Sequence, residues 1–220
     1  MIKMFMITDT ENIINKAGRD TEVAYQRARA LKELKRDMEF AIFASADTAA
    51  TSGVSGAEAV APLLRGVDAW VKRMLSNSGM SASTAATTIT EADFNLILQK
   101  AWVSGARPNT VYCNGGPKRV FSAWGLGSTR PRDVGLGKKL VNVVDVYVSD
   151  FGELDILLDR YTASQTFFVL DDNLWKKSFL VPTREKKIAE TGLVQNYMVW
   201  NQWTVECRNA SGNALGHSAP

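Results

Sequence analysis

The sequence predicts an α+β fold in which an elongated platform carries a compact inserted domain. Two long periodic segments predict the platform: a helical pattern over about residues 21–44 and an uninterrupted strand pattern over residues 195–207. At about 1.5 Å per helical residue and about 3.3 Å per strand residue, they would measure roughly 36 and 43 Å. Both exceed the usual length of their kind. Shorter helices and then shorter strands occupy the sequence between them, which indicates an inserted α+β domain.

The N-terminal helices are predicted from their start signals. Thr8 and Glu11 have the spacing of a capping box, so a short helix through Ile14 is expected to end at Gly18. Asp20 is placed to cap the long helix that follows. The apolar residues of that helix recur every three or four positions, as one face of a helix requires. They are Ala24, Ala28, Leu31, Leu34, Met38 and Ile42.

Two shorter helices are expected in the inserted domain, next to segments that resemble linkers. Residues 45–62 and 76–88 are rich in small and polar side chains and poor in bulky ones, which is typical of loops. The first helix covers about residues 63–74, and the second opens at Thr90 with Asp93 three residues on and ends at Gly105. The apolar face of the second helix comprises Phe94, Ile97, Leu98, Ala101 and Trp102.

The rest of the inserted domain is predicted to form strands. Residues 110–113 and 165–170 are short apolar runs, and residues 144–158 alternate around a turn at residues 149–152, as a hairpin does. One face of the hairpin is expected to carry Val144, Val146, Val148, Leu154, Ile156 and Leu158. The other face is expected to carry Glu153, Asp155 and Asp159.

The composition argues against several classes of protein. A net charge of +3 on 220 residues is too small to indicate a dedicated nucleic-acid-binding protein. The apolar run at residues 1–6 is too short for a signal peptide or a membrane span. Cys113 and Cys207 stand far apart, and we expect them to be small buried apolar groups rather than a disulfide.

No catalytic, cofactor or metal site is predicted. The single histidine, His217, lies in a tail rich in small residues that is expected to be flexible, so a Ser-His or Cys-His pairing or a zinc site cannot be assembled convincingly. Residues 125–139 lack the P-loop spacing, because Arg132 stands where a glycine is required and Lys139 replaces the Ser or Thr. Two acidic pairs, Asp155/Asp159 and Asp171/Asp172, are expected to be solvated carboxylates.

Charge is distributed unevenly between two adjoining segments. Residues 101–140 hold seven basic side chains and one acidic, a net charge of +6, whereas residues 141–160 hold one basic and five acidic, a net charge of −4. Three interpretations are open: solvated surface, a contact between the basic loop of one subunit and the acidic hairpin of the next, or contact of the loop with nucleic-acid phosphates. The candidate contact residues are Arg119, Arg130, Arg132, Lys138, Lys139, Asp150, Glu153 and Asp155.

Motifs over about residues 11–213 resemble, in order, those of the tailed-phage major capsid protein family. In the helical region they are 16–19, 22–26 and 32–39. In the inserted domain they are 127–130 with 138–141, 144–147 with 149–152, and 169–171 with Trp175 and Leu180. Glu206 and residues 208–212 close the series. Each motif is weak alone, and the ordered set is specific.

The resemblance implies the Hong Kong ninety-seven type of capsid fold, which encapsulins also use. It assigns residues 8–58 and 181–213 to a peripheral (P) domain, residues 59–180 to an axial (A) domain, and residues 214–220 to a flexible tail. It implies a non-enzymatic shell subunit that forms hexamers and pentamers around double-stranded DNA. The family's N-terminal arm and E-loop would precede this chain, which is expected to lack both.

The resemblance also implies partners and a location. The partners would be other copies of the chain, portal, scaffold or decoration proteins, and packaged DNA held by non-specific contact, with no membrane and no cofactor. The protein would be made in the cytoplasm of a host bacterium and end in the virion. Two alternatives remain: an encapsulin-like compartment shell, and a stand-alone DNA-binding protein that uses the loop over residues 107–139.

Overall fold

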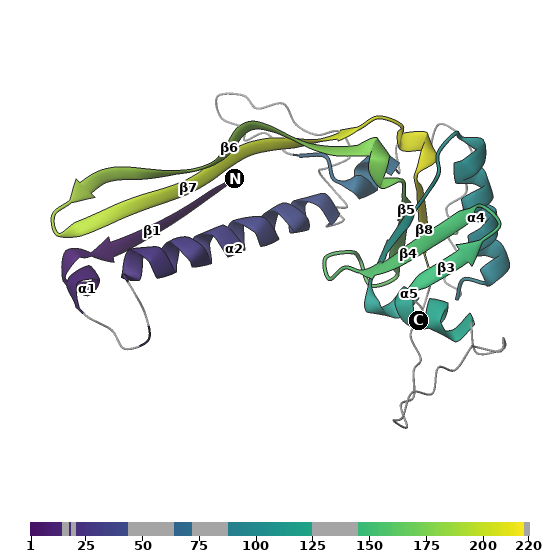
Figure 1. The fold of residues 1–220 in the computed structure, drawn as a ribbon, viewed down its shortest axis with the longest axis horizontal. Coiled ribbons are helices and arrows are strands. Elements are labelled where there is room, and N and C mark those ends of the chain that lie inside the picture. The colour runs from purple at the N-terminus through teal and green to yellow at the C-terminus, as the bar shows by residue number, and fades with distance from the viewer. Residues whose placement is uncertain (15–17, 19–20, 44–63, 72–87, 125–144, 218–220) are drawn as a thin grey trace, which may run out of the picture. The chain divides into compact units, whose positions relative to one another are not determined.

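The computed structural model describes residues 1–14, 18, 21–43, 64–71, 88–124 and 145–217, and it contains two compact units (Figure 1). Met1–Ile42 and Lys177–Glu206 form the first unit, and Phe43–Lys176 and Cys207–Pro220 form the second. The chain therefore leaves the first unit near Phe43 and returns to it near Lys177. The expected linkers 45–62 and 76–88 lie outside the described residues, apart from Thr88, and only residues 67–71 of the helix expected at 63–74 are described as helical.

The first unit is built on a three-stranded sheet with the order β1-β7-β6. β1 is Ile2–Thr8, β6 is Trp175–Thr191 and β7 is Val194–Cys207. The long C-terminal strand was predicted, whereas β1 and the even longer β6 were not. β1 runs antiparallel to β7 with Ile2 opposite Trp200 and Thr8 opposite Val194. Gly192, with φ +68°, supplies the left-handed turn between β6 and β7.

Two helices follow β1. α1, Asp9–Ile13, begins at the predicted cap, because the Thr8 hydroxyl accepts the Glu11 amide, but it ends before the expected Gly18. α2, Glu22–Phe43, is the predicted long helix. The hydroxyl of Thr21 accepts the amide of Ala24 at its start, so Thr21 rather than Asp20, whose position is not described, is seen to serve as a cap.

α2 packs one face against the sheet. Ala30, Leu34 and Val199 form the buried cluster, with Phe5 and Leu31 packed against it. The predicted stripe is therefore correct at Leu31, Leu34 and Met38, but wrong at Ala24 and Ala28, which are exposed. Which residues of α2 are buried depends on where the strands β1 and β7 contact it. The periodicity of the helix alone does not show this.

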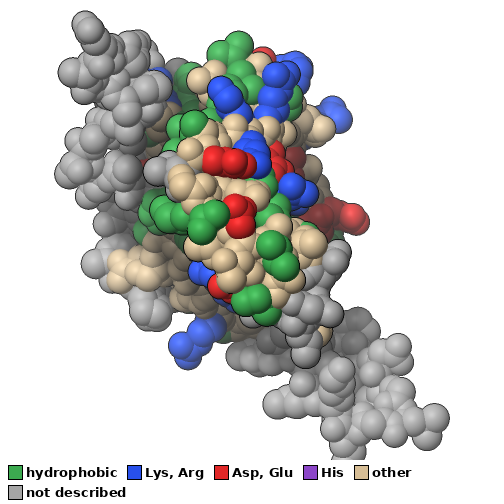
Figure 2. All heavy atoms as spheres, turned by 90° about the vertical axis from the view of Figure 1, so that its left-hand side faces the viewer, with side chains coloured by type: hydrophobic (Ala, Val, Ile, Leu, Met, Phe, Trp, Pro, Cys, Tyr) green, Lys and Arg blue, Asp and Glu red, His purple; other side chains and the backbone are tan. Residues whose placement is uncertain are grey.

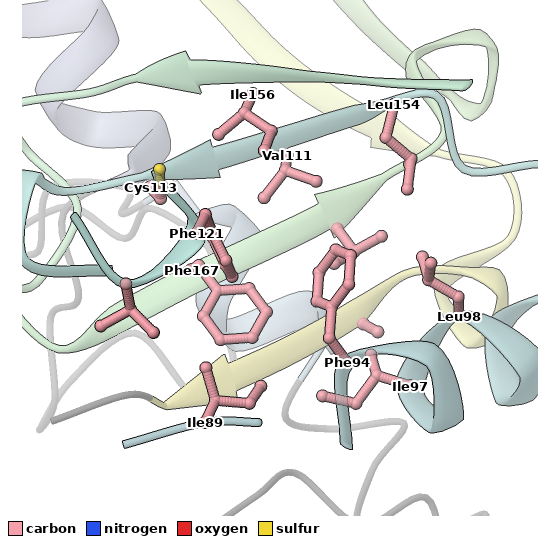
Figure 3. Close-up of a cluster of buried hydrophobic side chains, with 13 residues drawn as sticks. Ile89, Phe94, Ile97, Leu98, Val111, Cys113, Phe121, Leu154, Ile156 and Phe167 are labelled. Carbon is pink, nitrogen blue, oxygen red and sulfur yellow. The ribbon is translucent and has the colours of Figure 1, made fainter. Parts of the chain in front are cut away.

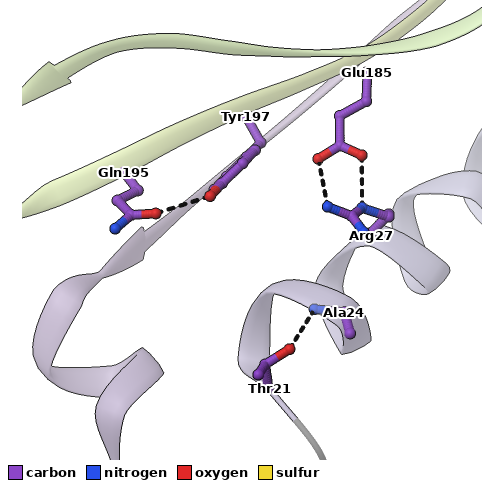
Figure 4. Close-up of polar contacts among 6 residues, drawn as sticks. All are labelled: Thr21, Ala24, Arg27, Glu185, Gln195 and Tyr197. Atoms are coloured by element: carbon purple, nitrogen blue, oxygen red, sulfur yellow. Dashed lines mark hydrogen bonds and ion pairs between the residues drawn. The ribbon is translucent and has the colours of Figure 1, made fainter.

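Polar contacts complete the attachment of α2 to the sheet (Figure 4). The Arg27 guanidinium grips the Glu185 carboxylate on β6 through Nε and Nη2, at 2.6 and 2.9 Å. Lys3 of β1 forms an ion pair with Asp37 at 2.7 Å. A two-pronged Arg–carboxylate contact fixes direction as well as distance, so it adds a directional contact between α2 and β6 to the apolar packing.

The second unit contains a five-stranded sheet with the order β3-β4-β2-β5-β8. The strands are β2 Thr110–Cys113, β3 Val146–Ser149, β4 Gly152–Leu158, β5 Thr166–Leu170 and β8 Ala214–His217. β2 and β4 are parallel, and the other described pairs are antiparallel. All of β5 is buried, and it is an inner strand of the sheet with β2 on one side and β8 on the other.

Helices α4, Glu91–Val103, and α5, Gly115–Trp124, contribute to the core on one face of this sheet. Side chains from α4 and the strands converge there around Phe94, Phe121 and Phe167 (Figure 3). The Thr90–Asp93 capping box is confirmed. Trp102, expected on the buried face of α4, is instead exposed. The sequence does not predict α5, because Gly115, Gly116 and Pro117 are residue types typical of a turn after a strand.

The tail expected to be flexible contains β8, so that expectation is wrong for residues 214–217. Ala214 and Leu215 are buried, and β8 pairs antiparallel with β5, with Gly216 opposite Phe167. The small residues that suggested a flexible tail are needed for packing. The ring of Phe167 covers Gly216 so closely that there is no space for a Cβ atom.

Candidate subunit-contact surfaces

The β3–β4 hairpin lies at one edge of the five-stranded sheet and presents a mixed apolar and acidic face. Val146 lies opposite Asp155, and Val148 lies opposite Glu153. Residues opposite each other in an antiparallel pair share a face. The two valines and the two acids are therefore exposed together. The expectation that Val146 and Val148 share a face with Leu154 and Ile156, and that the acids lie on the other face, is wrong.

The reason for this arrangement is the register of the hairpin. Tyr147 lies opposite Leu154, and these two residues face the core with Ile156. The aromatic ring of Tyr147 packs edge-on to Phe94 at 5.5 Å between ring centroids. A one-residue offset exchanges the two faces of a strand. In the sequence, the alternating valines are a stronger signal for the buried face than the single tyrosine between them. Leu158, expected on the same face as Leu154 and Ile156, is exposed whereas those two are buried.

The tip of the hairpin is held by local contacts that display Asp150. The Ser149 hydroxyl donates to the Gly152 carbonyl at 2.9 Å and accepts the Phe151 amide at 3.2 Å. Gly152 adopts φ +135°, a backbone conformation that residues other than glycine rarely adopt. Phe151 packs near Trp102, with 6.2 Å between ring centroids. Asp150 is thus fixed in an exposed position at the end of the hairpin.

A buried lysine below the hairpin was missed by sequence reasoning. Lys118 of α5 donates from Nζ to the Ile156 carbonyl at 2.9 Å and forms an ion pair with Asp145 at 3.1 Å. Its neighbour Arg119 is exposed. Of these two basic residues, Lys118 is therefore bound within the second unit, and Arg119 is exposed to solvent. Of the other candidate residues, Arg130, Arg132, Lys138 and Lys139 lie outside the described residues.

Two acids expected to be solvated are buried caps instead. Asp159 accepts the Thr162 hydroxyl at 2.6 Å and the amide of Thr162 at 2.9 Å. Asp171 accepts the amides of Arg107 and Asn173, both at 3.1 Å. Each carboxylate satisfies backbone donors that a loop would otherwise leave unpaired. In the described part of the chain, no three His, Cys, Asp or Glu side chains gather as a metal site would require.

The described thiols and the tyrosine at the core edge are not activated for chemistry. Burial raises the pKa of Cys113 to about 11 and that of Cys207 to about 11. A reactive cysteine needs a lowered pKa. Burial, and then the hydrogen bond to Glu91, raise the pKa of Tyr147 to about 12. Both cysteines are free thiols.

Over the described ranges, no helix is long and apolar enough to cross a membrane.

This fold is similar to solved structures of phage capsid proteins and of an encapsulin. The chain is similar to a capsid protein of cyanophage A-1(L), with a TM-score of 0.72 at 11% identity over 99% of this chain and 76% of that one. It is also similar to the SrpI encapsulin of Synechococcus elongatus PCC 7942, with a TM-score of 0.62 at 8% identity over 99% and 72% of the two chains. The gp27 major capsid protein of phage G gives a TM-score of 0.55 at 12% identity over 100% and 70%. The fold is therefore that of the phage capsid proteins of the Hong Kong ninety-seven type.

The family model for the SU10 major capsid protein matches residues 1–218. The chain therefore belongs to the SU10 major capsid protein family, as the ordered motifs predicted, and it is a structural protein of the phage head that builds an icosahedral shell from copies of itself. Its place is the capsid of the virion. No curated protein sequence matches the chain significantly.

Proposed function

We propose that the chain forms the hexamers and pentamers of a shell that encloses double-stranded DNA, with the first unit as its P domain and the second as its A domain. Within each ring, the acidic hairpin of one subunit meets basic residues of its neighbour. The single observation that supports this contact is the β3–β4 hairpin, which displays three acids and two valines on an exposed sheet edge.

The charges of the hairpin favour contact with a basic partner. Asp150, Glu153 and Asp155 are exposed and form no ion pair with a described residue. Lys118 already neutralises Asp145, so the excess charge is concentrated toward the outer edge. Arg119 is an exposed base of the same unit, and Arg130, Arg132, Lys138 and Lys139 are the remaining candidates. Opposite charges across a repeated contact set both orientation and specificity.

The valines would supply the apolar part of the same contact. An edge strand leaves one row of backbone donors and acceptors unpaired, and natural proteins protect such edges with charge or cover them with another element. Val146 and Val148 are exposed on this edge strand. A neighbouring subunit that covers them would remove apolar surface from water, while the acids select which surface can approach.

Charge reversal tests the ring contact. The double variant Asp150→Lys and Glu153→Lys should assemble less well than the wild type, as measured by negative-stain electron microscopy and light scattering. Glu39→Lys, an exposed acid of α2 in the other unit, is the matched control. Combining the double variant with Arg130→Glu and Arg132→Glu should restore rings. Normal assembly of the hairpin variant would contradict the proposed contact.

The likeness to the SrpI encapsulin supports a second candidate, a compartment shell that holds a cargo enzyme. A cargo gene beside this one would favour it, and terminase and portal genes would favour the phage head.

For the phage head we propose synthesis in the host bacterial cytoplasm, portal, scaffold or decoration proteins as further partners, and non-specific contact with packaged DNA. A steep salt dependence of DNA binding by the isolated chain would instead support a stand-alone DNA-binding protein.

A further inference from the structure

The outer face of the first unit's sheet carries an apolar strip on two neighbouring strands. β1 and β7 place Ile2 opposite Trp200 and Met4 opposite Met198. Met6 follows on the same face of β1, because alternate residues of a strand point the same way. We call these five residues the β1–β7 strip. The alternate residues of β1 face α2, where Lys3 pairs with Asp37 and Phe5 joins the buried cluster.

The three β1 members of the strip are largely exposed to solvent, whereas Met198 and Trp200 on β7 are half-buried. Ile2, Met4 and Met6 are 59%, 68% and 74% exposed. Figure 2 shows hydrophobic side chains at the surface of the described chain, among charged ones, as seen from one end of Figure 1. The three β1 side chains together expose on the order of 400 Å² of mostly apolar surface, which is within the range of the largest patch on a typical monomer and is often functional there.

The chemistry of the strip selects its partner. Its five residues carry no charged side chain, so they offer a partner apolar contact rather than an ion pair. The chain belongs to a family of major capsid proteins, which build a shell from copies of themselves, so a second copy is the partner that assembly brings to this face. A stable pairwise interface buries about 800 Å² on each partner. The strip supplies about half of that area, which suits one of several weak contacts that a shell repeats many times.

We propose that the β1–β7 strip is covered by a second copy of this chain in the assembled shell. This surface is separate from the acidic hairpin, because it lies in the other unit and uses apolar burial rather than charge. The inference rests on self-assembly of the chain and not on the proposed ring contact. Burial of flexible methionines on such a face tolerates small changes of angle, because a Met side chain repacks easily.

Two methionines of the strip are natural probes of its burial. Hydrogen peroxide converts exposed methionines to sulfoxides, and peptide mass spectrometry reports the rate at each position. Assembled particles and dissociated subunits of the wild-type chain would be treated in parallel. We expect Met4 and Met6 to oxidise roughly fivefold or more slowly in particles. Met38, buried within the first unit, should be slow in both states and serves as the internal reference. Equal rates at Met4 and Met6 in both states, or a wild-type chain that never associates, would overturn the proposal.

Substitution gives the second measurement. The Met4→Gln and Met6→Gln double variant should retain the circular dichroism spectrum of the wild type but form fewer particles at equal concentration. Ile13→Gln changes an apolar side chain of α1 that is 81% exposed and outside the strip, and it should assemble normally. Normal assembly of the double variant would count against the strip. A failure of the hairpin variants alone to alter assembly would contradict the ring contact and leave the protection of Met4 and Met6 as an independent result.

Discussion

Gly216→Ala tests whether the C-terminal residues are an integral strand of the second unit. A Cβ atom at this position would lie 2.1 Å from Cζ of Phe167 and 2.5 and 2.7 Å from its two Cε atoms. The ring cannot move aside easily, because it is fully buried and packs at 5.3 Å from Phe121 and 6.0 Å from Phe94 between ring centroids. Overpacking of this kind costs about 1–3 kcal/mol.

The measurement is the free energy of unfolding from urea titration, together with the melting temperature. For a chain of this size, a loss of about 1–3 kcal/mol lowers the melting temperature by roughly 2–12 °C. Gly115→Ala is the matched control, because a Cβ at Gly115 meets no atom within 4 Å and the residue begins α5. The control should be neutral or stabilised by up to about 1 kcal/mol. Equal stability of Gly216→Ala and the wild type would refute the packing of β8 against β5.

Three further predictions concern the same unit. Phe94→Ala should lower the free energy of unfolding by about 3–5 kcal/mol, because the side chain is fully buried among four aromatic rings, and Phe94→Leu should recover part of the loss; a loss below about 1 kcal/mol in urea titration would contradict this. Asp159→Asn should destabilise by about 1–3 kcal/mol, because the carboxylate accepts both donors of Thr162, and calorimetry showing no change would argue against the cap. Burial raises the folded pKa of Tyr147 to about 12, so the stability contribution of the protonated phenol is complete below pH 10 and is lost as pH rises from about 10 through about 12. The free energy of unfolding of Tyr147→Phe should therefore fall less steeply than that of the wild type between about pH 10 and about pH 12. Identical pH profiles of the two proteins would show that another group controls alkaline unfolding.

Local signals in the sequence identified many of the elements correctly. The helical period and the long alternation gave α2 and β7, since each is continuous over many residues and amphipathic. Thr90 and Asp93 identified the start of α4, because a capping box depends only on residues three apart. The ordered motifs gave the capsid family, which the match over residues 1–218 confirmed.

Other features depended on partners distant in the sequence. β1 was not predicted because its strand character becomes clear only beside β7, nearly 200 residues later. Val146 and Val148 were assigned to the wrong face, since only packing against Phe94 shows that Tyr147 is the residue turned inward. The sequence likewise predicts a flexible tail where the structure has β8, because small residues are typical of loops and only the tertiary structure shows the ring of Phe167 packed against Gly216.

The candidate contact surfaces show the same division. The charge contrast is visible in the sequence, since charges can be counted without coordinates, and the structure shows that Asp150, Glu153 and Asp155 are exposed. The tertiary structure alone showed that Lys118 is turned inward to Asp145 and that Ile2, Met4 and Met6 remain uncovered. Residue type and spacing fix which side chains can alternate on a strand. Which of the two faces is buried is decided by the elements that pack against it, and these come from the other end of the chain.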